Sequence, residues 1–169
     1  MKLPQEMPNT NTEMQHEAFW VVRFAPFRTP WKEVVKRGIF TPRGIKSAEA
    51  RKHLLAMRKG DPVFFYETHD TKAVVGCMEV SKEAYPDPTI AEGAWVTCDF
   101  IPVRSLRRPV GLSQIKDDPL LRDTALVKQP RLSVVHLGRP AFQAIERLGS
   151  DKSAAGMNTR EESRNEEAT

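Results

Sequence analysis

The side chains that most often do catalytic chemistry are scattered along this sequence. None of its four histidines is paired at i,i+4 with another His or a Cys, as a helical metal site requires; they are His16, His53, His69 and His136. Ser133 lacks the G-x-S-x-G turn that exposes a nucleophile, and the pair Asp117-Asp118 precedes a proline that ends a helical turn. No phosphate-binding glycine motif is present. We therefore expect no enzyme, no metal and no cofactor.

Basic and aromatic side chains form a more informative pattern. Tyr66 and His69 lie at the end of a predicted strand and in the turn after it, Arg43 and Lys46 precede a predicted helix, and Arg131 precedes a closing strand. Cations of this kind contact phosphate groups, and aromatic rings stack on bases. In the simpler alternative the rings pack in the core and the cations are solvated.

The charge is concentrated in the middle of the chain. The whole sequence carries a net +4, but residues 19–149 hold 22 Lys or Arg against 14 Asp or Glu, a net of +8. Each end, 1–18 and 150–169, carries a net charge of −2. A basic region of this size attracts phosphate backbones through counterion release, although many cytosolic domains of similar charge bind no nucleic acid.

These side chains must be positioned by a mixture of strands and helices. Alternating or continuous apolar runs predict strands over 19–24, 62–66, 73–80, 95–103 and 132–135. Helical spacing with capping residues predicts helices over 31–37, 48–59 and 140–148, with short helical turns at 112–115 and 120–121. Because most of the strands follow one another directly, we expect an α+β fold with a mixed, largely antiparallel sheet flanked by helices.

Composition sets the outer limits of the molecule. With 169 residues the chain is long enough for one ordinary domain, which we place at 19–149 between polar tails, 1–18 and 150–169, that we expect to be disordered. The two cysteines, Cys77 and Cys98, are isolated and predict reduced thiols in the core. No apolar run is long enough to span a bilayer and no secretion signal precedes the domain, so we expect a cytoplasmic protein without membrane contact.

Several segments in a fixed order resemble one known family, the EVE domain, over about residues 19–149. They are Phe19-Trp20-Val21-Val22-Arg23, Lys59-Gly60-Asp61, Val63-Phe64-Phe65-Tyr66, Val75-Gly76, Tyr85-Pro86-Asp87-Pro88, Trp95-Val96, Arg107-Arg108-Pro109-Val110, Leu126-Val127-Lys128-Gln129 and Arg131-Leu132-Ser133-Val134. The resemblance implies a PUA-like fold, a mixed β-barrel flanked by helices, in the superfamily of the YTH and ASCH domains. It also implies a nucleic-acid-binding domain that reads modified bases, notably modified cytosine, in DNA or RNA.

The sequence departs from the family where the base pocket is expected. The family's usual Trp-x-Gly-Val-Arg-Asn segment reads Pro42-Arg43-Gly44-Ile45-Lys46-Ser47 here, and its Lys-Ser-Glu-Pro segment reads Arg23-Phe24-Ala25-Pro26. Replacing Trp by Pro removes a stacking surface, which Phe24 can refill from the other side. We assign the remaining roles provisionally: phosphate contacts to Arg43, Lys46, Arg51 and Arg131; the base pocket to Phe24, Trp31, Tyr66 and the neighbouring His69; and hydrogen bonds to Ser47 and Ser133.

The altered pocket motivates a second hypothesis of a different class. In this alternative the domain has lost its nucleic-acid ligand and acts as a protein-interaction module. Ser47 has its own simpler interpretation, because a serine before a helix is a favourable N-cap. The sequence makes no prediction of the oligomeric state.

Overall fold

The structure is a computed structural model that describes residues 18–150. The expected tails, 1–18 and 150–169, therefore lie almost entirely outside the described residues. The elements in chain order are β1 Phe19–Phe24, α2 Trp31–Arg37, α3 Ala48–Ala56, β2 Pro62–Glu67, β3 Ala73–Pro86, β4 Val96–Gly111, α4 Leu112–Asp117, α5 Ala125–Lys128, β5 Val134–Leu137 and α6 Arg139–Leu148.

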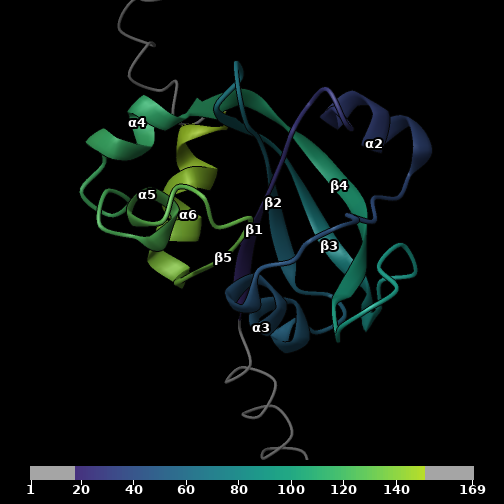
Figure 1. The fold of residues 1–169 in the computed structure, drawn as a ribbon. Coiled ribbons are helices and arrows are strands. Elements are labelled where there is room, and N and C mark those ends of the chain that lie inside the picture. Colours follow the sequence, from purple (N-terminus) through teal and green to yellow (C-terminus); the bar gives the residue numbers. More distant parts are fainter. Residues whose placement is uncertain (1–17, 151–169) are drawn as a thin grey trace, which may run out of the picture.

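The strands form a single mixed sheet in the order β4-β3-β2-β1-β5 (Figure 1). The central strands β1 and β2 are parallel, with Trp20 opposite Val63 and Phe24 opposite Glu67, and every other neighbouring pair is antiparallel. The parallel pair is possible because α2 and α3 lie between these strands in the sequence and supply the crossover. The prediction of an α+β fold with a mixed, largely antiparallel sheet is confirmed.

The family resemblance implied a mixed β-barrel, and this part of the prediction is wrong, because the sheet is open between β4 and β5 in the described residues. Helices fill the gap between these edge strands. The Cys98 thiol in β4 donates to the Leu54 carbonyl of α3, and the His53 ring of the same helix lies 2.8 Å from the Val134 carbonyl of β5. At the other end of β4 the Gly149 carbonyl after α6 accepts from the backbone of Arg107 and Arg108. Within residues 18–150, strand β5 has four residues and pairs with β1 alone.

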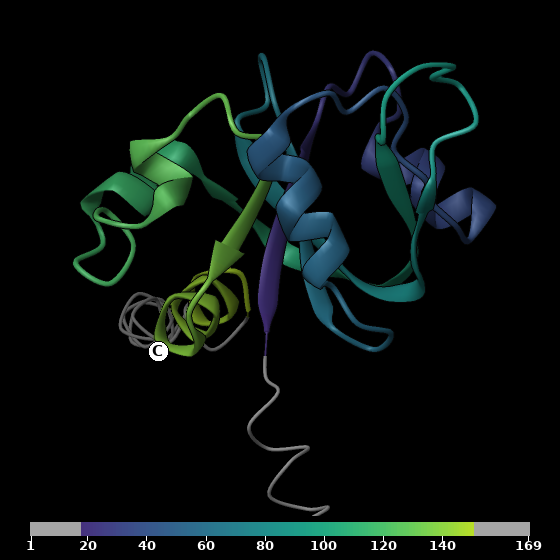
Figure 2. The ribbon, with the colours of Figure 1, turned by 60° about the horizontal axis from the view of Figure 1, so that its bottom comes forward.

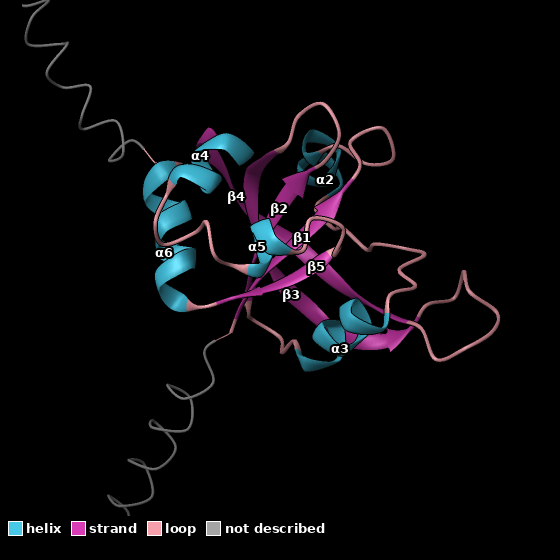
Figure 3. Ribbon diagram, turned by 60° about the vertical axis from the view of Figure 1, so that its left-hand side comes forward, coloured by secondary structure: helices cyan, strands magenta, loops and turns pink. Residues whose placement is uncertain are grey.

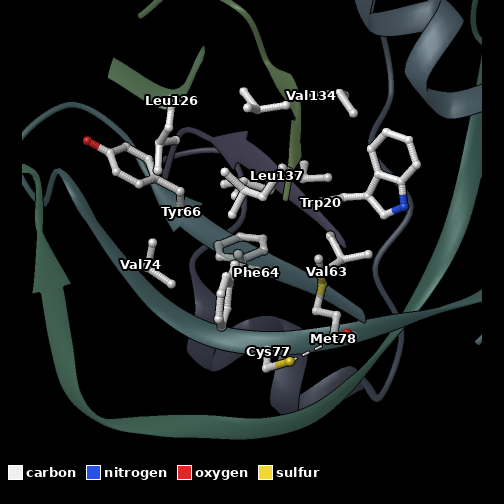
Figure 4. Close-up of a cluster of buried hydrophobic side chains, with 14 of the residues drawn as sticks. Trp20, Val63, Phe64, Tyr66, Val74, Cys77, Met78, Leu126, Val134 and Leu137 are labelled. Carbon is white, nitrogen blue, oxygen red and sulfur yellow. Dashed lines mark hydrogen bonds between the residues drawn. The ribbon is translucent and has the colours of Figure 1, made fainter. Parts of the chain in front are cut away.

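Helices cover both faces of the sheet (Figures 2 and 3). Helices α4, α5 and α6 gather on one face, α2 lies on the other, and α3 crosses one end of the strands. Alternate residues of the central strands therefore enter different layers. Phe64 stacks on Phe142 of α6 at 4.2 Å, whereas Phe65 packs against Trp31 of α2 at 5.3 Å. Figure 4 shows Phe64 with Tyr66 and Leu126 in the buried cluster.

Local signals explain where most elements begin and end. Gly38 ends α2 in the left-handed conformation with φ of 76°, and the Ser47 hydroxyl caps α3 by accepting from the Ala50 N–H at 3.2 Å. The predicted ends of β3 and β4 were too early, since both strands continue through polar sequence to Pro86 and Gly111. Strand β4 tolerates Pro109 and its many arginines because it is an edge strand. The helical turn predicted at 120–121 is a non-helical turn, and α5 follows it.

The cysteines behave as the sequence predicts. Both are buried free thiols, and burial raises the pKa of Cys77 to about 11 and that of Cys98 to about 12. At neutral pH both are therefore protonated and weakly nucleophilic. Across residues 18–150 no helix is long and apolar enough to cross a membrane.

Candidate nucleic-acid interface

An arginine-rich hollow lies on the α2 face of the sheet. Its volume is about 370 Å³, and we call it the arginine hollow. It is bounded by the end of β1, the turn before α2 and the segment after α2, and it is lined by Phe24, Arg28, Thr29, Arg37, Ile39, Phe40, Thr41 and Arg43. Pockets for small flat ligands have this size and this mixture of apolar walls and a few polar groups.

Two aromatic rings form the floor of the arginine hollow. Phe24 and Phe40 meet edge to face with ring centroids 4.9 Å apart, and Phe40 packs in the same way on Phe65 below it. The Arg28 guanidinium lies 4.6 Å from the centroid of the Phe24 ring. This stacking of a cation on a ring, over rings held by the core, gives a preorganised surface for a flat, electron-rich group.

Arg43 lines the arginine hollow with a partly exposed side chain. Its Nη1 is the one buried side-chain nitrogen or oxygen within residues 18–150 that has no hydrogen-bond partner. Its Nη1 also lies 4.0 Å from Asp87 Oδ1, too far for a hydrogen bond. Arg28 donates to the Arg43 carbonyl at 3.3 Å, which ties the two arginines together. The Arg43 side chain is 41% exposed, so the accessible part of its guanidinium can donate to a ligand acceptor in the arginine hollow.

Asp87 holds the segment that carries Arg43. Its carboxylate is 3% exposed and accepts from the Gly44 N–H at 2.8 Å, the Thr89 N–H at 2.8 Å and the Thr89 hydroxyl at 2.6 Å. Gly44 has φ of 78°, a conformation that favours glycine. Burial of the carboxyl alone would raise the pKa of Asp87, but these hydrogen bonds and the Arg43 charge outweigh burial and hold the pKa below its ordinary value.

This network makes stability depend on pH in a defined direction. At neutral pH we expect Asp87→Ala to lower the free energy of unfolding by about 2 kcal/mol, because buried N–H groups lose their acceptor. Since the folded pKa lies below the unfolded value of about 3.9, the carboxylate's contribution is complete above that value and is lost as the pH falls through the folded pKa. Urea unfolding at several pH values should show that the difference in the free energy of unfolding between wild type and variant becomes smaller in acid. Asp117→Ala, at an exposed site, is the control; a difference that becomes larger in acid contradicts the assignment.

A wider groove adjoins the arginine hollow on the far side of the 41–47 segment. Its volume is about 910 Å³, and we call it the Lys46 groove; Gly44, Lys46, Thr89, Ile90, Ala91, Glu92, Gly93 and Trp95 line it. The Arg51 guanidinium lies 4.8 Å from the centroid of the Trp95 ring and donates to the Ala94 carbonyl at 3.5 Å. Cations and one partly exposed indole therefore continue away from the arginine hollow.

The structure brings only some of the sequence-predicted residues together. Phe24 and Arg43 share the arginine hollow, while Lys46 lines its groove and Arg51 flanks it. Trp31 is buried in the core, where its indole N–H donates to the Ser105 hydroxyl at 2.8 Å. The remaining predicted residues take other places: Ser47 caps α3, Ser133 accepts from the Arg23 N–H through its carbonyl, and Arg131 is exposed in the turn before β5.

Tyr66 and His69 lie in a separate hollow from Phe24. Tyr66 pairs with Arg23 across β1 and β2, and the Arg23 guanidinium lies 5.4 Å from the centroid of the Tyr66 ring. Because Phe24 is the next residue after Arg23, its side chain points to the opposite face of the sheet. A single base pocket lined by both Phe24 and Tyr66 therefore does not form.

Two arginines of the site had no recognisable signal in the sequence, and Asp87 had only an indirect one. Arg28 and Arg37 read in the sequence as solvated charges of a turn and a helix, and Arg37 does make an ion pair with Glu33 at 3.0 Å. Asp87 stood in the Tyr-Pro-Asp-Pro segment of the family resemblance, and that segment was the one signal that could have found it.

Comparisons with known proteins agree with this fold. The family model described as EVE domain matches residues 18–148. Thymocyte nuclear protein 1 of chicken is 29% identical over 132 residues, covering 64% of this chain and 54% of that protein, so the chain spans about half the length of this curated relative. An NMR structure of a protein from Rhodopseudomonas palustris is 36% identical, with a TM-score of 0.74 over 78% of this chain and 92% of that one.

A further solved structure holds DNA. Human thymocyte nuclear protein 1, solved in complex with DNA containing 5-methylcytosine, is 22% identical, with a TM-score of 0.71 over 78% of this chain and 98% of that chain. At this identity the likeness concerns the fold. The family model covers most of the chain, over nearly the same residues as the resemblance seen in the sequence. The chain belongs to the EVE domain family.

Proposed function

We propose that this domain binds DNA containing modified cytosine and receives the base in the arginine hollow. The observation that carries the proposal is the convergence of Arg28, Arg37 and Arg43 on a floor of two phenylalanine rings. Guanidinium groups donate to the ring nitrogen and carbonyl oxygen of cytosine, and aromatic floors replace the stacking that a base loses when it leaves the helix.

The apolar part of the arginine hollow suits a modified base. Ile39, which is 44% exposed, and the rings of Phe24 and Phe40 offer carbon surface to a substituent on the base. Burying a methyl group against such surface contributes about 0.8 kcal/mol, enough to favour the modified base several-fold over cytosine. The human relative solved with 5-methylcytosine DNA supports this choice of ligand.

The Lys46 groove supplies the contacts outside the base. Lys46 is exposed beside it and Arg51 stacks on Trp95, so the phosphates that flank a bound base would run past these cations. Such contacts position a strand without reading its sequence. They weaken as the salt concentration rises, because the release of counterions on binding then becomes less favourable. The modified base should bind about fourfold more tightly than cytosine, because burial of roughly one methyl group separates the two ligands. This ratio should persist as salt rises, while the affinity for both ligands falls.

We expect Arg43→Ala to weaken binding of 5-methylcytosine DNA by about tenfold or more, because a charge-assisted hydrogen bond contributes about 1.5–3 kcal/mol. The measurement is fluorescence anisotropy of labelled single strands and duplexes, with and without 5-methylcytosine, at two salt concentrations. Arg122→Ala is the matched control, because Arg122 is an exposed arginine between α4 and α5, on the opposite side of the sheet.

Three results would decide between the hypotheses. If Arg43→Ala and Arg122→Ala weaken binding equally, the interaction depends only on overall charge, and the arginine hollow is not the base site. Preference for the same sequence in RNA would favour an RNA ligand, and the predicted cytoplasmic location belongs with that outcome. No affinity for any strand at low salt would favour the alternative, a protein-interaction module.

A further inference from the structure

A second hollow lies on the face of the sheet opposite the arginine hollow. Its volume is about 270 Å³, and we call it the tyrosine hollow. It lies between the turn that joins β2 to β3, helix α4 and the segment around α5. Its lining is Arg23, Tyr66, Thr68, His69, Lys72, Leu112, Lys116, Leu126, Val127 and Pro130.

The charge of the tyrosine hollow is entirely positive. Among the described residues, the charged side chains that line it are Arg23, Lys72 and Lys116, with no Asp or Glu. Arg23 is 7% exposed, and within residues 18–150 it makes no ion pair with a carboxylate; its guanidinium donates to backbone carbonyls instead. Burial accordingly lowers the pKa of Arg23, since desolvation outweighs its attraction to Tyr66. A buried cation without a counter-charge favours an anion in the adjoining space.

The Tyr66 hydroxyl is a free donor at this hollow. Tyr66 as a whole residue is 4% exposed, and its hydroxyl has no hydrogen-bond partner among the described residues, although it is not one of their buried unsatisfied atoms. Figure 4 shows the hydroxyl pointing away from the packed cluster that surrounds the ring. Burial raises the pKa of Tyr66 more than the nearby Arg23 lowers it, so the phenol is neutral and donates at physiological pH. Because the hydroxyl is not among the buried unsatisfied atoms of the described residues, it reaches solvent at the hollow, where the oxygen of a ligand can accept from it.

We propose that the tyrosine hollow binds one phosphorylated nucleotide, either a free mononucleotide or the phosphorylated end of a strand. A phosphomonoester carries about 1.5 to 2 negative charges at neutral pH, which matches a set of three cations better than a single carboxylate does. The apolar side of the hollow, formed by Leu112, Leu126 and Val127, accommodates the sugar and base. Because this site lies on the other face of the sheet, the proposal does not depend on the arginine hollow.

The test is isothermal titration calorimetry of the full chain with cytidine 5′-monophosphate, cytidine and inorganic phosphate, followed by an oligonucleotide with and without a 5′-phosphate. We expect the monophosphate or the 5′-phosphorylated strand to bind at least about tenfold more tightly than its unphosphorylated form and than phosphate alone. If the 5′-phosphorylated strand binds and the mononucleotide does not, the ligand is the phosphorylated end of a strand. Absence of binding by both phosphorylated ligands at millimolar concentration overturns the proposal, as does equal binding of inorganic phosphate.

Two variants locate the site. Tyr66→Phe should weaken the phosphorylated ligand about threefold without loss of stability, because the hydroxyl has no internal bond to lose. The double variant Lys72→Gln, Lys116→Gln should weaken binding of the phosphorylated ligand about tenfold or more. Its control is the double variant Lys52→Gln, Lys59→Gln, which loses the same charge on and after α3 and should leave this binding unchanged. Anisotropy with unphosphorylated 5-methylcytosine DNA should stay within about twofold for Tyr66→Phe, because that ligand uses the other face. Binding that survives both hollow variants overturns the assignment.

Discussion

Replacing Arg23 by methionine should lower the free energy of unfolding by about 3–5 kcal/mol, the largest effect we expect from any single substitution outside the hydrophobic core. The guanidinium of Arg23 donates to the carbonyls of Gln129 at 2.9 Å and Leu132 at 2.6 Å, and also to that of Leu126. It thereby holds the α5 segment against β1. Methionine retains much of the apolar stem but leaves the buried carbonyls without a donor. The measurement is urea denaturation followed by circular dichroism.

Two controls separate this geometry from charge alone. Arg23→Lys should recover only part of the loss, because one ammonium group cannot reach carbonyls that the planar guanidinium spans. Arg131→Ala removes an exposed arginine from the neighbouring turn and should change stability by less than about 0.5 kcal/mol. A loss below about 1 kcal/mol for Arg23→Met would show that the carbonyls find other donors.

Gly76→Ala should cost about 3 kcal/mol, because Trp31 of α2 lies directly on this glycine in β3. A β-carbon at Gly76 would stand 2.1 Å from the Cε2 and Cζ2 atoms of the indole. The ring cannot withdraw freely, since it packs on Phe65 and its N–H donates to the Ser105 hydroxyl at 2.8 Å. Urea denaturation gives the stability, and a change in tryptophan fluorescence should accompany it.

A double-mutant cycle tests the cause. Trp31→Leu removes the ring, so Gly76→Ala in that background should cost less than about 1 kcal/mol, a coupling of about 2 kcal/mol. Gly138→Ala is a matched control, because a β-carbon there meets only Pro140 at 3.7 Å, an ordinary contact. Equal costs of Gly76→Ala in both backgrounds would place the strain in the strand backbone instead of the indole.

The sequence predicted most elements because their ends carry local signals. Gly38 and Ser47 bound α2 and α3 through their own backbone and side-chain chemistry, which needs no partner elsewhere in the chain. The C-terminal half of β4 was missed because Arg104, Arg107 and Pro109 have no apolar alternation, and only its position at the sheet edge makes them acceptable. Whether the sheet closes into a barrel depends on how far β4 and β5 extend. This is a property of the tertiary structure, and no local sequence pattern predicts it.

The candidate site was predictable only in part, for reasons of strand geometry. Phe24 and Arg43 were identified, and they do share a hollow. Tyr66 was assigned to the same pocket, yet the side to which a strand residue points depends on register, and β1 and β2 are joined by two helices that leave the register open in the sequence. Register places Tyr66 opposite Arg23, one position away from Phe24, and thereby divides one predicted pocket into two hollows.

The open sheet has a consequence for self-association. Exposed edge strands invite further strands and start cross-β aggregation. Here Phe40 exchanges both backbone hydrogen bonds with Phe100 on the outer side of β4, at 2.8 Å each, and the Gly149 carbonyl engages Arg107 and Arg108 farther along. On the opposite edge the His53 ring contacts the Val134 carbonyl. An incoming strand would have to displace these contacts first, so the domain resists intermolecular sheet extension without sealing itself into a barrel.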